Sequence, residues 1–471
     1  MARLGVSSRL GACTPQARKS LMTEIAPAET ASPASATPVS APPYSKAYVR
    51  YAMWLLLGIY IVNFVDRSVI NILAEPIKQD LNLADWQLGL MSGLAFALLY
   101  TILGIPIARM AEHSHRPRII SLAAATWSGF TIACAFAANF WQLLLFRVGV
   151  GVGEAGCTPP AHSLIVDYHP IEKRASALSF YSLGGAIGTL LGLVIGGLVY
   201  DAYGWRVSFL VAGAPGLLFA LLAYFTLKEP RTILARHAAA AAGSAATFAQ
   251  TMDYLFKNPT FWFIAFGAMI VNFGGGTAFT ASFFLRVHTA EVAAMAAGLG
   301  LKSVGFLGLT MGLTNAAGAV GIWMGGWITD RYGARDLRNY VVAPAIAALV
   351  GMPIRVLLYT VDSAGLALVL LAVVTFLGGF WWGPVFSVGQ SVVPPYMRAT
   401  SAAILLFTIN LIGTGMGPLI LGLVSDYFNH GLGMGPAEGV RWALLATVVL
   451  GFAAFACFWL ARRTIRRDFL S

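Results

Sequence analysis

Twelve apolar stretches, each long enough to cross a lipid bilayer as a helix, dominate the sequence. They lie at about residues 51–73, 87–109, 118–138, 142–166, 175–200, 206–227, 260–285, 304–328, 340–360, 366–390, 399–424 and 441–461. A helix needs about 20 apolar residues to span the hydrocarbon core, where its backbone polar groups must be satisfied within the segment. Only 11% of the residues are charged, against about 25% in soluble domains. The sequence therefore predicts an all-α membrane protein with twelve transmembrane helices.

The predicted helices fall into two sets of six, which are separated by a more polar segment. We predict a disordered N-terminal tail (1–47), a first six-helix bundle (48–227), a linker (228–258), a second six-helix bundle (259–462) and a basic tail (463–471). The tail is rich in Ala, Ser, Thr and Pro, a composition that cannot bury enough apolar surface to fold. Within the linker we predict a short surface helix from Asp253 to Lys257.

Basic residues in the loops predict the orientation in the membrane. Loops on the side of the linker hold thirteen Lys and Arg residues, and the opposite loops hold five. The positive-inside rule then places the linker and both termini in the cytoplasm. Because the net charge of +11 comes from residues at the ends of apolar spans, we expect no nucleic-acid partner. The four cysteines have no paired spacing, so we expect no disulfide, metal or other cofactor.

The two halves of the chain repeat each other. Two motifs recur at offsets of 224 and 225 residues: Pro170-x-x-x-Arg174-Ala as Pro394-x-x-x-Arg398-Ala, and Gly197-Leu-Val-Tyr-Asp201 as Gly422-Leu-Val-Ser-Asp426. The first spans match through Ile61-Val-Asn-Phe64 and Ile270-Val-Asn-Phe273. A parallel duplication of six helices predicts two pseudo-symmetric bundles with a substrate path between them.

Four ionisable residues interrupt the predicted first and fourth helices: Asp66, Arg67, Arg147 and Glu154. Arg147 and Glu154 are seven residues apart, so they share one helix face about 10 Å apart along the axis. Ionisable groups in hydrocarbon cost several kcal/mol each and usually face a bundle interior or an aqueous cavity. In the second repeat three glycines (274–276) stand where the first has Val65, Asp66 and Arg67. We therefore predict a working site on the first bundle alone.

The chemistry of these four residues predicts proton coupling. Asp66 cannot pair with adjacent Arg67, because neighbouring residues point in different directions on a helix, but it shares a face with Asn63. The proton affinity of a carboxylate depends on a nearby arginine, so moving that arginine would couple protons to a conformational change. Asp66 and Glu154 are the predicted proton carriers, and Arg67 or Arg147 would bind a phosphate or carboxylate. The alternative is a structural ion-pair network between the two helices.

Further polar or aromatic residues in the spans are candidates to line a central cavity. The candidates for substrate binding, besides the two arginines, are Asn63, Tyr100, Asn272, Trp382, Gln390 and Asn410. Each has a simpler alternative, which is a helix-to-helix hydrogen bond or packing in the core.

A loop motif makes the chain resemble the major facilitator superfamily. The superfamily's Gly-x-x-x-Asp-Arg-x-Gly-x-Arg is nearly intact as Gly326 to Arg335, with Asp330 and Arg331 at its centre. The copy after the second span is degraded, with Glu112-His113 in place of Asp-Arg. An acid at a helix end beside basic residues can form a latch between bundles. The predicted latch residues are Glu112, Arg116, Asp330, Arg331 and Arg335, and the alternative is that they signal topology alone.

Three segments resemble the Spinster branch of that superfamily, which transports lysophospholipids and sphingosine phosphate, in a bacterial version. They are NFVDR (63–67), RVGVGVGEAG (147–156) and the stretch from Gly383 to Pro418. Gly188-x-x-x-Gly192 is also similar to the superfamily's antiporter motif, with Leu193 in place of its proline. The resemblance implies a monomeric secondary transporter in the inner membrane of a bacterium, which moves an anionic, lipid-like amphiphile by proton-coupled alternating access.

Two other classes of function remain open from the sequence. The same charged residues would serve a proton-coupled carrier of soluble organic anions or drugs. A membrane receptor or lipid-modifying enzyme is the other class, but the sequence has no nucleophile-and-base constellation, metal-ligand cluster or phosphate-binding glycine loop. We therefore do not expect an enzyme.

Overall fold

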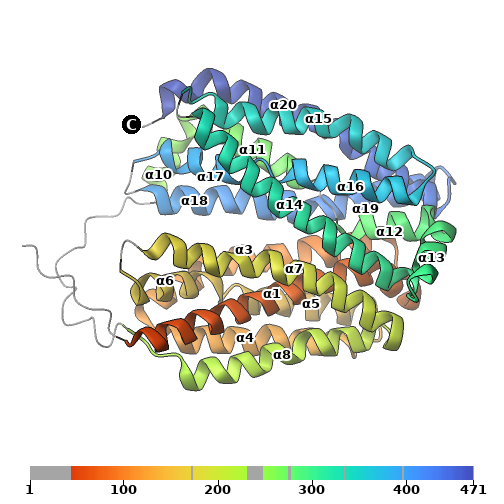
Figure 1. Ribbon diagram of the computed structural model, residues 1–471, viewed down its shortest axis with the longest axis horizontal. Helices are drawn as coiled ribbons and strands as arrows, with labels where there is room; N and C mark the ends of the chain where they lie inside the picture. The colour runs from red at the N-terminus through yellow and green to blue at the C-terminus, as the bar shows by residue number, and fades with distance from the viewer. Residues whose placement is uncertain are drawn as a thin grey trace, which may run out of the picture. The chain divides into compact units, whose positions relative to one another are not determined.

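In the computed structural model, helices make up all the regular structure that is described (Figure 1). The structure describes residues 44–170, 173–230, 248–273, 277–333, 335–394 and 397–469. The all-α prediction is confirmed over these ranges. Most of the predicted N-terminal tail, the middle of the predicted linker and the three glycines at 274–276 lie outside the described residues.

The first bundle starts at a capped helix and ends at the linker. Its helices are α1 (Lys46–Leu81), α2 (Asp85–Gly89), η1 (Leu90–Leu94), α3 (Ala95–His113), α4 (Arg116–Cys134), α5 (Phe140–Glu154), α6 (Thr158–Tyr168), α7 (Arg174–Tyr203) and α8 (Trp205–Thr226). The Ser45 hydroxyl accepts a hydrogen bond from the Tyr48 N–H at 3.3 Å and so caps α1. Asn82 ends α1 in the left-handed conformation, with φ 51°.

The second bundle follows the same order after a short helix in the predicted linker. Its helices are α10 (Phe248–Phe256), α11 (Pro259–Phe273), α12 (Thr277–Val287), α13 (Thr289–Gly298), α14 (Ser303–Gly333), α15 (Asn339–Thr360), α16 (Ala364–Gly378), α17 (Trp382–Ser391), α18 (Arg398–Phe407), η4 (Thr408–Met416), α19 (Gly417–Asp426), η5 (Tyr427–Gly431) and α20 (Pro436–Asp468). The predicted surface helix from Asp253 to Lys257 overlaps α10, which begins five residues earlier and ends one residue earlier, at Phe256.

Ten stretches among the described residues are long and apolar enough to cross a membrane. The other two predicted spans correspond to α4 and to α5 followed by α6. The first turn of α4 carries Arg116 and Arg118, and the fourth span is divided between Glu154 and Thr158. Charge and a break in the helix thus explain why these two spans are less apolar or shorter than the others.

Glycines bring equivalent helices together in the two bundles. A side chain at any of four glycines would meet a carbonyl oxygen of the partner helix: Gly188 that of Ile61, Gly192 that of Val65, Gly413 that of Met269, and Gly417 that of Phe273. Because Gly188 and Gly413 are equivalent in the repeat, their contact residues Ile61 and Met269 are equivalent in space. The sequence match had paired Ile61 with Ile270, which is one residue later. The small-residue motif acts in close helix packing in both halves.

We expect Gly192→Val to destabilise the first bundle just behind the charged residues of α1. A Cβ atom at Gly192 would lie 2.8 Å from the Val65 carbonyl oxygen and 2.9 Å from Ser68 Cβ. Overpacking of this kind costs about 1–3 kcal/mol of the free energy of unfolding, which a denaturant titration would measure. Gly129→Val is the matched control, because a Cβ there meets nothing within 4 Å. Equal effects of the two substitutions would contradict the packing argument.

The two bundles contact each other closely along two seams. In one seam α7 packs on α14, and in the other α2 and η1 pack on α19 and η4, while α12 also packs on α1. A side chain at Gly197 would meet the Val304 carbonyl, and one at Gly422 would meet the Asp85 carbonyl. These residues belong to the ends of the spans that face away from the central linker, which we call the distal end. In the second seam the π-helical segments η1 and η4 also contact each other, nearer the middle of the two spans than the distal end.

Candidate functional site

Helices α1 and α5 bring the predicted proton carrier Glu154 against Arg67. The Arg67 Nη2 lies 2.5 Å from Glu154 Oε2, and its Nε donates to the same oxygen at 3.2 Å. Glu154 is 1% exposed, and its Oε1 has no hydrogen-bond partner among the described residues. The pair joins the first and fourth spans, so the negative charge of Glu154 on the fourth span is balanced by Arg67 on the first.

Three aromatic rings surround the guanidinium of Arg67. Its Cζ lies 4.8 Å from the ring centre of Phe64, 4.5 Å from that of Phe96 and 4.9 Å from that of Tyr100. The side chain of Arg67 is nevertheless 28% exposed. Cation–π contacts hold the guanidinium in place, while part of its surface is accessible to another anion. Tyr100 was a sequence candidate, whereas Phe64 and Phe96 were not; only the one-turn spacing of Phe64 from Arg67 could have indicated the former.

Arg147 and Asp66 are buried more deeply than Arg67. Arg147 is 1% exposed, and its Nη1 donates to the backbone carbonyl of Asp66 at 3.5 Å. Asp66 is 0% exposed, and neither carboxylate oxygen has a well-formed hydrogen bond among the described residues. Thr131 of α4, Arg147 and Glu154 are its polar neighbours. Arg147 thus supports the backbone of α1, and the accessible cation of the group is Arg67.

Asn63 completes the polar group on α1, one turn before Asp66 and Arg67. It is 2% exposed and lies close to Glu154. Thr131 was missed in the sequence, because one threonine in an apolar span carries no signal until α4 is packed against α1. The first-bundle candidates therefore gather in one buried cluster, which we call the charged cluster: Asn63, Asp66, Arg67, Arg147 and Glu154.

The candidates from the second bundle lie apart from one another. Trp382 is 41% exposed and stacks on Trp381 with the ring centres 4.9 Å apart. Gln390 is one residue from the end of α17, where its carbonyl accepts a hydrogen bond from Arg398 at 3.1 Å. Asn272 of α11 and Asn410 of η4 are partly buried. Among the described residues, no hydrogen bond or ring contact joins these four to the charged cluster, so their role in substrate binding stays a prediction.

The predicted latch residues do not bridge the bundles in this structure. Arg116 lies 2.7 Å from Asp167 and also pairs with Glu229, both of which adjoin the first bundle. Asp330, Arg331 and Arg335 are exposed. Among the described residues none of these three has an ion pair, and Arg331 lies over the Trp327 ring at 5.7 Å. The side chain of Glu112 lies outside the described residues, so the latch stays a prediction for another conformation.

We expect Arg116→Met to destabilise the first bundle rather than to change the conformational equilibrium. The Arg116 side chain is fully buried, and its loss would leave Glu229, 7% exposed, without this cation. Removing one partner of a buried ion pair costs about 3–5 kcal/mol, which should appear as a lower unfolding temperature. Arg335→Met is the exposed control. A change in distances between the bundles without loss of stability would instead support the latch.

The distal end holds a charge cluster that the sequence analysis did not single out. Arg286 of α12 binds Asp85 of α2 in a bidentate manner at 2.9 and 2.8 Å, and its Nε donates to Glu75 of α1 at 2.8 Å. Lys78 also pairs with Asp85. The exposed fractions of the Arg286 and Glu75 side chains are only 6% each. These four residues, which we call the distal seal, join the second bundle to the first.

Two residues of α19 also bind α2, in the seam where α2 and η1 pack on α19 and η4. Asp426 accepts hydrogen bonds from the backbone N–H groups of Asp85 at 3.1 Å and of Trp86 at 2.8 Å. A carboxylate at the N-terminus of α2 satisfies free donors and complements the helix dipole. The Ser425 hydroxyl donates to Asp85 at 2.6 Å.

On the α7–α14 seam, Asp201 plays the matching part. It accepts hydrogen bonds from the backbone N–H groups of Lys302 and Gly305 at 2.9 and 3.0 Å. Among the described residues, every hydrogen bond and ion pair between the bundles lies at the distal end. The structure is therefore closed at that end, and a path to the charged cluster would lead from the linker side.

Comparisons with known proteins agree with this architecture. A model of the Major Facilitator Superfamily matches residues 56–414. A solved bacterial homolog of the human lysosomal transporter Spinster, in an inward-facing and unoccupied conformation, is 32% identical with a TM-score of 0.79, over 91% of this chain and 100% of that one. An MFS-type efflux pump of Mycolicibacterium smegmatis is 29% identical over 88% of this chain and 94% of its own. Protein spinster homolog 1 of Xenopus laevis is 26% identical over 80% of this chain and 73% of its own.

Proposed function

The chain belongs to the Major Facilitator Superfamily and is a multi-pass secondary transporter, and we propose that it moves an anionic, lipid-like amphiphile by proton-coupled alternating access. The observation that carries this proposal is the arrangement around Arg67. The arginine is 28% exposed, while its partner Glu154 is buried. An incoming phosphate or carboxylate can therefore reach the guanidinium from the accessible side and compete with Glu154 for it.

This competition supplies a way to couple protons. When an anionic head group takes over Arg67, Glu154 remains buried without its direct ion-pair partner, a state that costs several kcal/mol. A proton taken up by the Glu154 carboxylate removes that cost. After the head group leaves on the other side of the membrane, Arg67 pairs with Glu154 again and the proton is released. Asp66, which has no well-formed hydrogen bond among the described residues, is the second proton carrier in this scheme.

The surroundings of Arg67 favour an amphiphile over a purely polar anion. Phe64, Phe96 and Tyr100 present apolar ring surfaces next to the cation, which suits a head group that continues into a hydrocarbon chain. The likeness to the bacterial Spinster homolog, at 32% identity, agrees with the Spinster-like segments from which a lipid-like substrate was predicted. If the linker lies in the cytoplasm, as the positive-inside rule predicts, closure at the distal end is closure on the outer side of the membrane.

Ligand-induced stabilisation of the purified protein tests the substrate class. A ligand that binds only the folded state raises the unfolding temperature. We expect lysophospholipids or sphingoid phosphates to stabilise the wild type, and Arg67→Met to lose that effect. Arg147→Met serves as the comparison, because this buried arginine contacts backbone and should alter overall stability more than ligand response. Stabilisation by soluble organic anions alone would overturn the lipid-like substrate.

A carrier of soluble organic anions or drugs is the second candidate function. The name of the Mycolicibacterium smegmatis relative, an MFS-type efflux pump, favours it. The same Arg67–Glu154 exchange would couple protons to such a substrate. Flux assays in liposomes that compare a lysophospholipid with a soluble carboxylate would separate the two functions, because only one should move when a proton gradient is applied.

A further inference from the structure

The repeated motif Gly-Leu-Val-x-Asp places one aspartate on each seam between the bundles. Asp201 ends the first copy (197–201), near the end of α7, and Asp426 ends the second copy (422–426), at the end of α19. Each carboxylate accepts two hydrogen bonds, between 2.8 and 3.1 Å long, from backbone N–H groups of the opposite bundle. The contact made by the second bundle is therefore a copy, in the repeat, of the contact made by the first.

Both aspartates bind the beginning of a span. Asp201 binds the N-terminus of α14, and Asp426 binds that of α2, which begins the span Asp85–Gly104. These are the eighth and second spans, which are equivalent in a repeat of six helices. The first N–H groups of a helix have no partner within the helix and carry a partial positive charge, so a carboxylate stabilises them. Each bundle therefore both gives and receives one such cap.

Neither of the two capped helices has a cap of its own. The residue before α2 is Ala84, which has no side-chain acceptor, and the residue before α14 is Lys302, whose ammonium group only donates. In the first bundle, by contrast, the side chains of Ser45 and Asn139 cap α1 and α5 locally. Closure of the seams thus supplies α2 and α14 with acceptors that the preceding residues lack.

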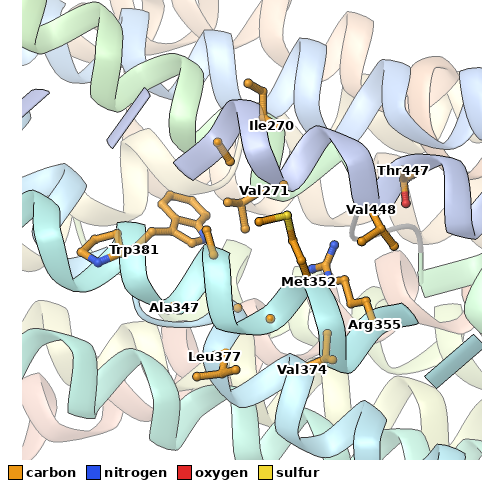
Figure 2. Close-up of a pocket in the computed structure, with 16 residues that line it drawn as sticks. Ile270, Val271, Ala347, Met352, Arg355, Val374, Leu377, Trp381, Thr447 and Val448 are labelled. Carbon is orange, nitrogen blue, oxygen red and sulfur yellow. The ribbon is translucent and has the colours of Figure 1, made fainter. Parts of the chain in front are cut away.

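The interior of the second bundle does not lie on either seam. Its cavity along α15, which residues of α11, α16 and α20 also line, has a volume of about 40 Å³, enough for about three water molecules. Figure 2 shows Val271, Met352 and Val374 in its wall. Close-packed interiors deform little, so we expect opening of the distal end to part the seams and to leave each bundle intact.

We propose that Asp201 and Asp426 act as paired caps that keep the distal end closed. While the bundles are joined, a carboxylate binds each of the two helix N-termini. When the bundles part, both N-termini exchange that carboxylate for water. The two caps are lost together, because each bundle contributes one aspartate and one capped helix. The paired caps work at the distal end whatever molecule is transported, so they do not depend on the substrate proposed above.

Spin-label distances in the full-length protein test the paired caps. One pair of labels joins the distal ends of α7 and α14, and the other joins those of α2 and α19. Loss of a helix cap changes an equilibrium constant by about two- to 30-fold. We expect Asp201→Ala to raise the ratio of distally open to closed molecules by that factor at both label pairs. In Asp201→Ala/Asp426→Ala the two factors should multiply, whereas Asp201→Asn, which keeps a good acceptor, should remain largely closed.

A local cap separates the role in closure from simple support of a helix. Ala84 has the extended backbone of a cap position, with φ −75° and ψ 161°. Adding Ala84→Ser to Asp426→Ala would cap α2 in open and closed molecules alike. We expect this second change to restore the unfolding temperature but not the closure. Restored closure would show that Asp426→Ala had only loosened α2, and would overturn the paired caps.

A cap within one bundle provides the matched control. Glu291 of α13 accepts a hydrogen bond at 2.6 Å from the N–H of Ala364, the first residue of α16. Glu291→Ala should lower the unfolding temperature and leave both label distances unchanged. Widening confined to the seam whose aspartate is replaced would show two independent contacts and overturn the pairing. Wild-type distances in the double variant would overturn closure by these carboxylates altogether.

Discussion

Glu154→Gln is expected to abolish substrate accumulation driven by a proton gradient while the protein stays folded. Glutamine keeps the size of the side chain and can still accept a hydrogen bond from Arg67, but it cannot take up a proton. One pH unit is worth about 1.4 kcal/mol per proton. If one proton moves with each monoanion, a gradient of two units sustains about 100-fold accumulation in the wild type. In liposomes without a membrane potential, the variant should show no accumulation of substrate.

Two matched substitutions sharpen this experiment. Glu438→Gln removes a carboxylate that pairs with Arg441 and is 39% exposed, so it should leave accumulation unchanged. Asp66→Asn tests the second proton carrier, and loss of accumulation there as well would mean that both carboxylates take part. Gradient-driven accumulation at the wild-type level in Glu154→Gln would refute the exchange at Arg67, whatever Asp66→Asn does.

Arg286→Met is expected to open the distal end. The substitution leaves Glu75 and Asp85, 5% and 0% exposed, without the cation that joins them to α12. An unpaired buried charge costs about 3–5 kcal/mol. Asp85 keeps its pair with Lys78, so the unpaired charge is that of Glu75. Opening exposes the Glu75 carboxylate to water and removes that cost, so the ratio of distally open to closed molecules should rise by about two to four orders of magnitude. Distances between spin labels at the distal ends of α2 and α19 would report the change.

An exposed ion pair in the first bundle provides the control for Arg286→Met. Arg206 lies 2.8 Å from Asp80, with side chains that are 46% and 44% exposed. Because exposed pairs contribute little, Arg206→Met should leave the label distances unchanged. Arg286→Lys should restore closure in part, since Lys keeps the charge and loses the bidentate geometry. Wild-type distances in Arg286→Met would show that the glycine contacts close the distal end without the charges.

The sequence was sufficient for the architecture and for the residues of the charged cluster. Length and apolarity alone predict spans, and the repeated glycines at Gly192 and Gly417 predict close helix contacts that both bundles show. Which residues pair within the cluster could not be predicted from the sequence. Arg147 and Glu154 share a helix face, but the partner of Glu154 is Arg67. That choice depends on how α1 and α5 are rotated against each other, which local spacing does not encode.

The distal seal was missed for a related reason. Glu75, Asp85 and Arg286 stand at or near the ends of predicted spans, where charges ordinarily mark the membrane boundary. Arg286 lies 201 residues from Asp85 in the chain, so their contact becomes visible only when the two bundles are assembled. The loop motif predicted a latch at Asp330, Arg331 and Arg335 instead, and these three residues are exposed in this conformation. The latch therefore stays a prediction for another state of the transport cycle.

The facing segments η1 and η4 have a mechanical consequence. A regular α-helix resists bending because the same hydrogen-bond ladder holds every turn, whereas a π-helical turn interrupts that ladder and is a common place for a kink. Here two such turns touch each other from opposite bundles. Spans two and eleven are therefore most compliant at this shared depth. The linker-side halves of these two spans can rotate about the π-helical segments while the distal contacts stay in place. A small rotation there produces a large displacement at the linker-side surface of the membrane.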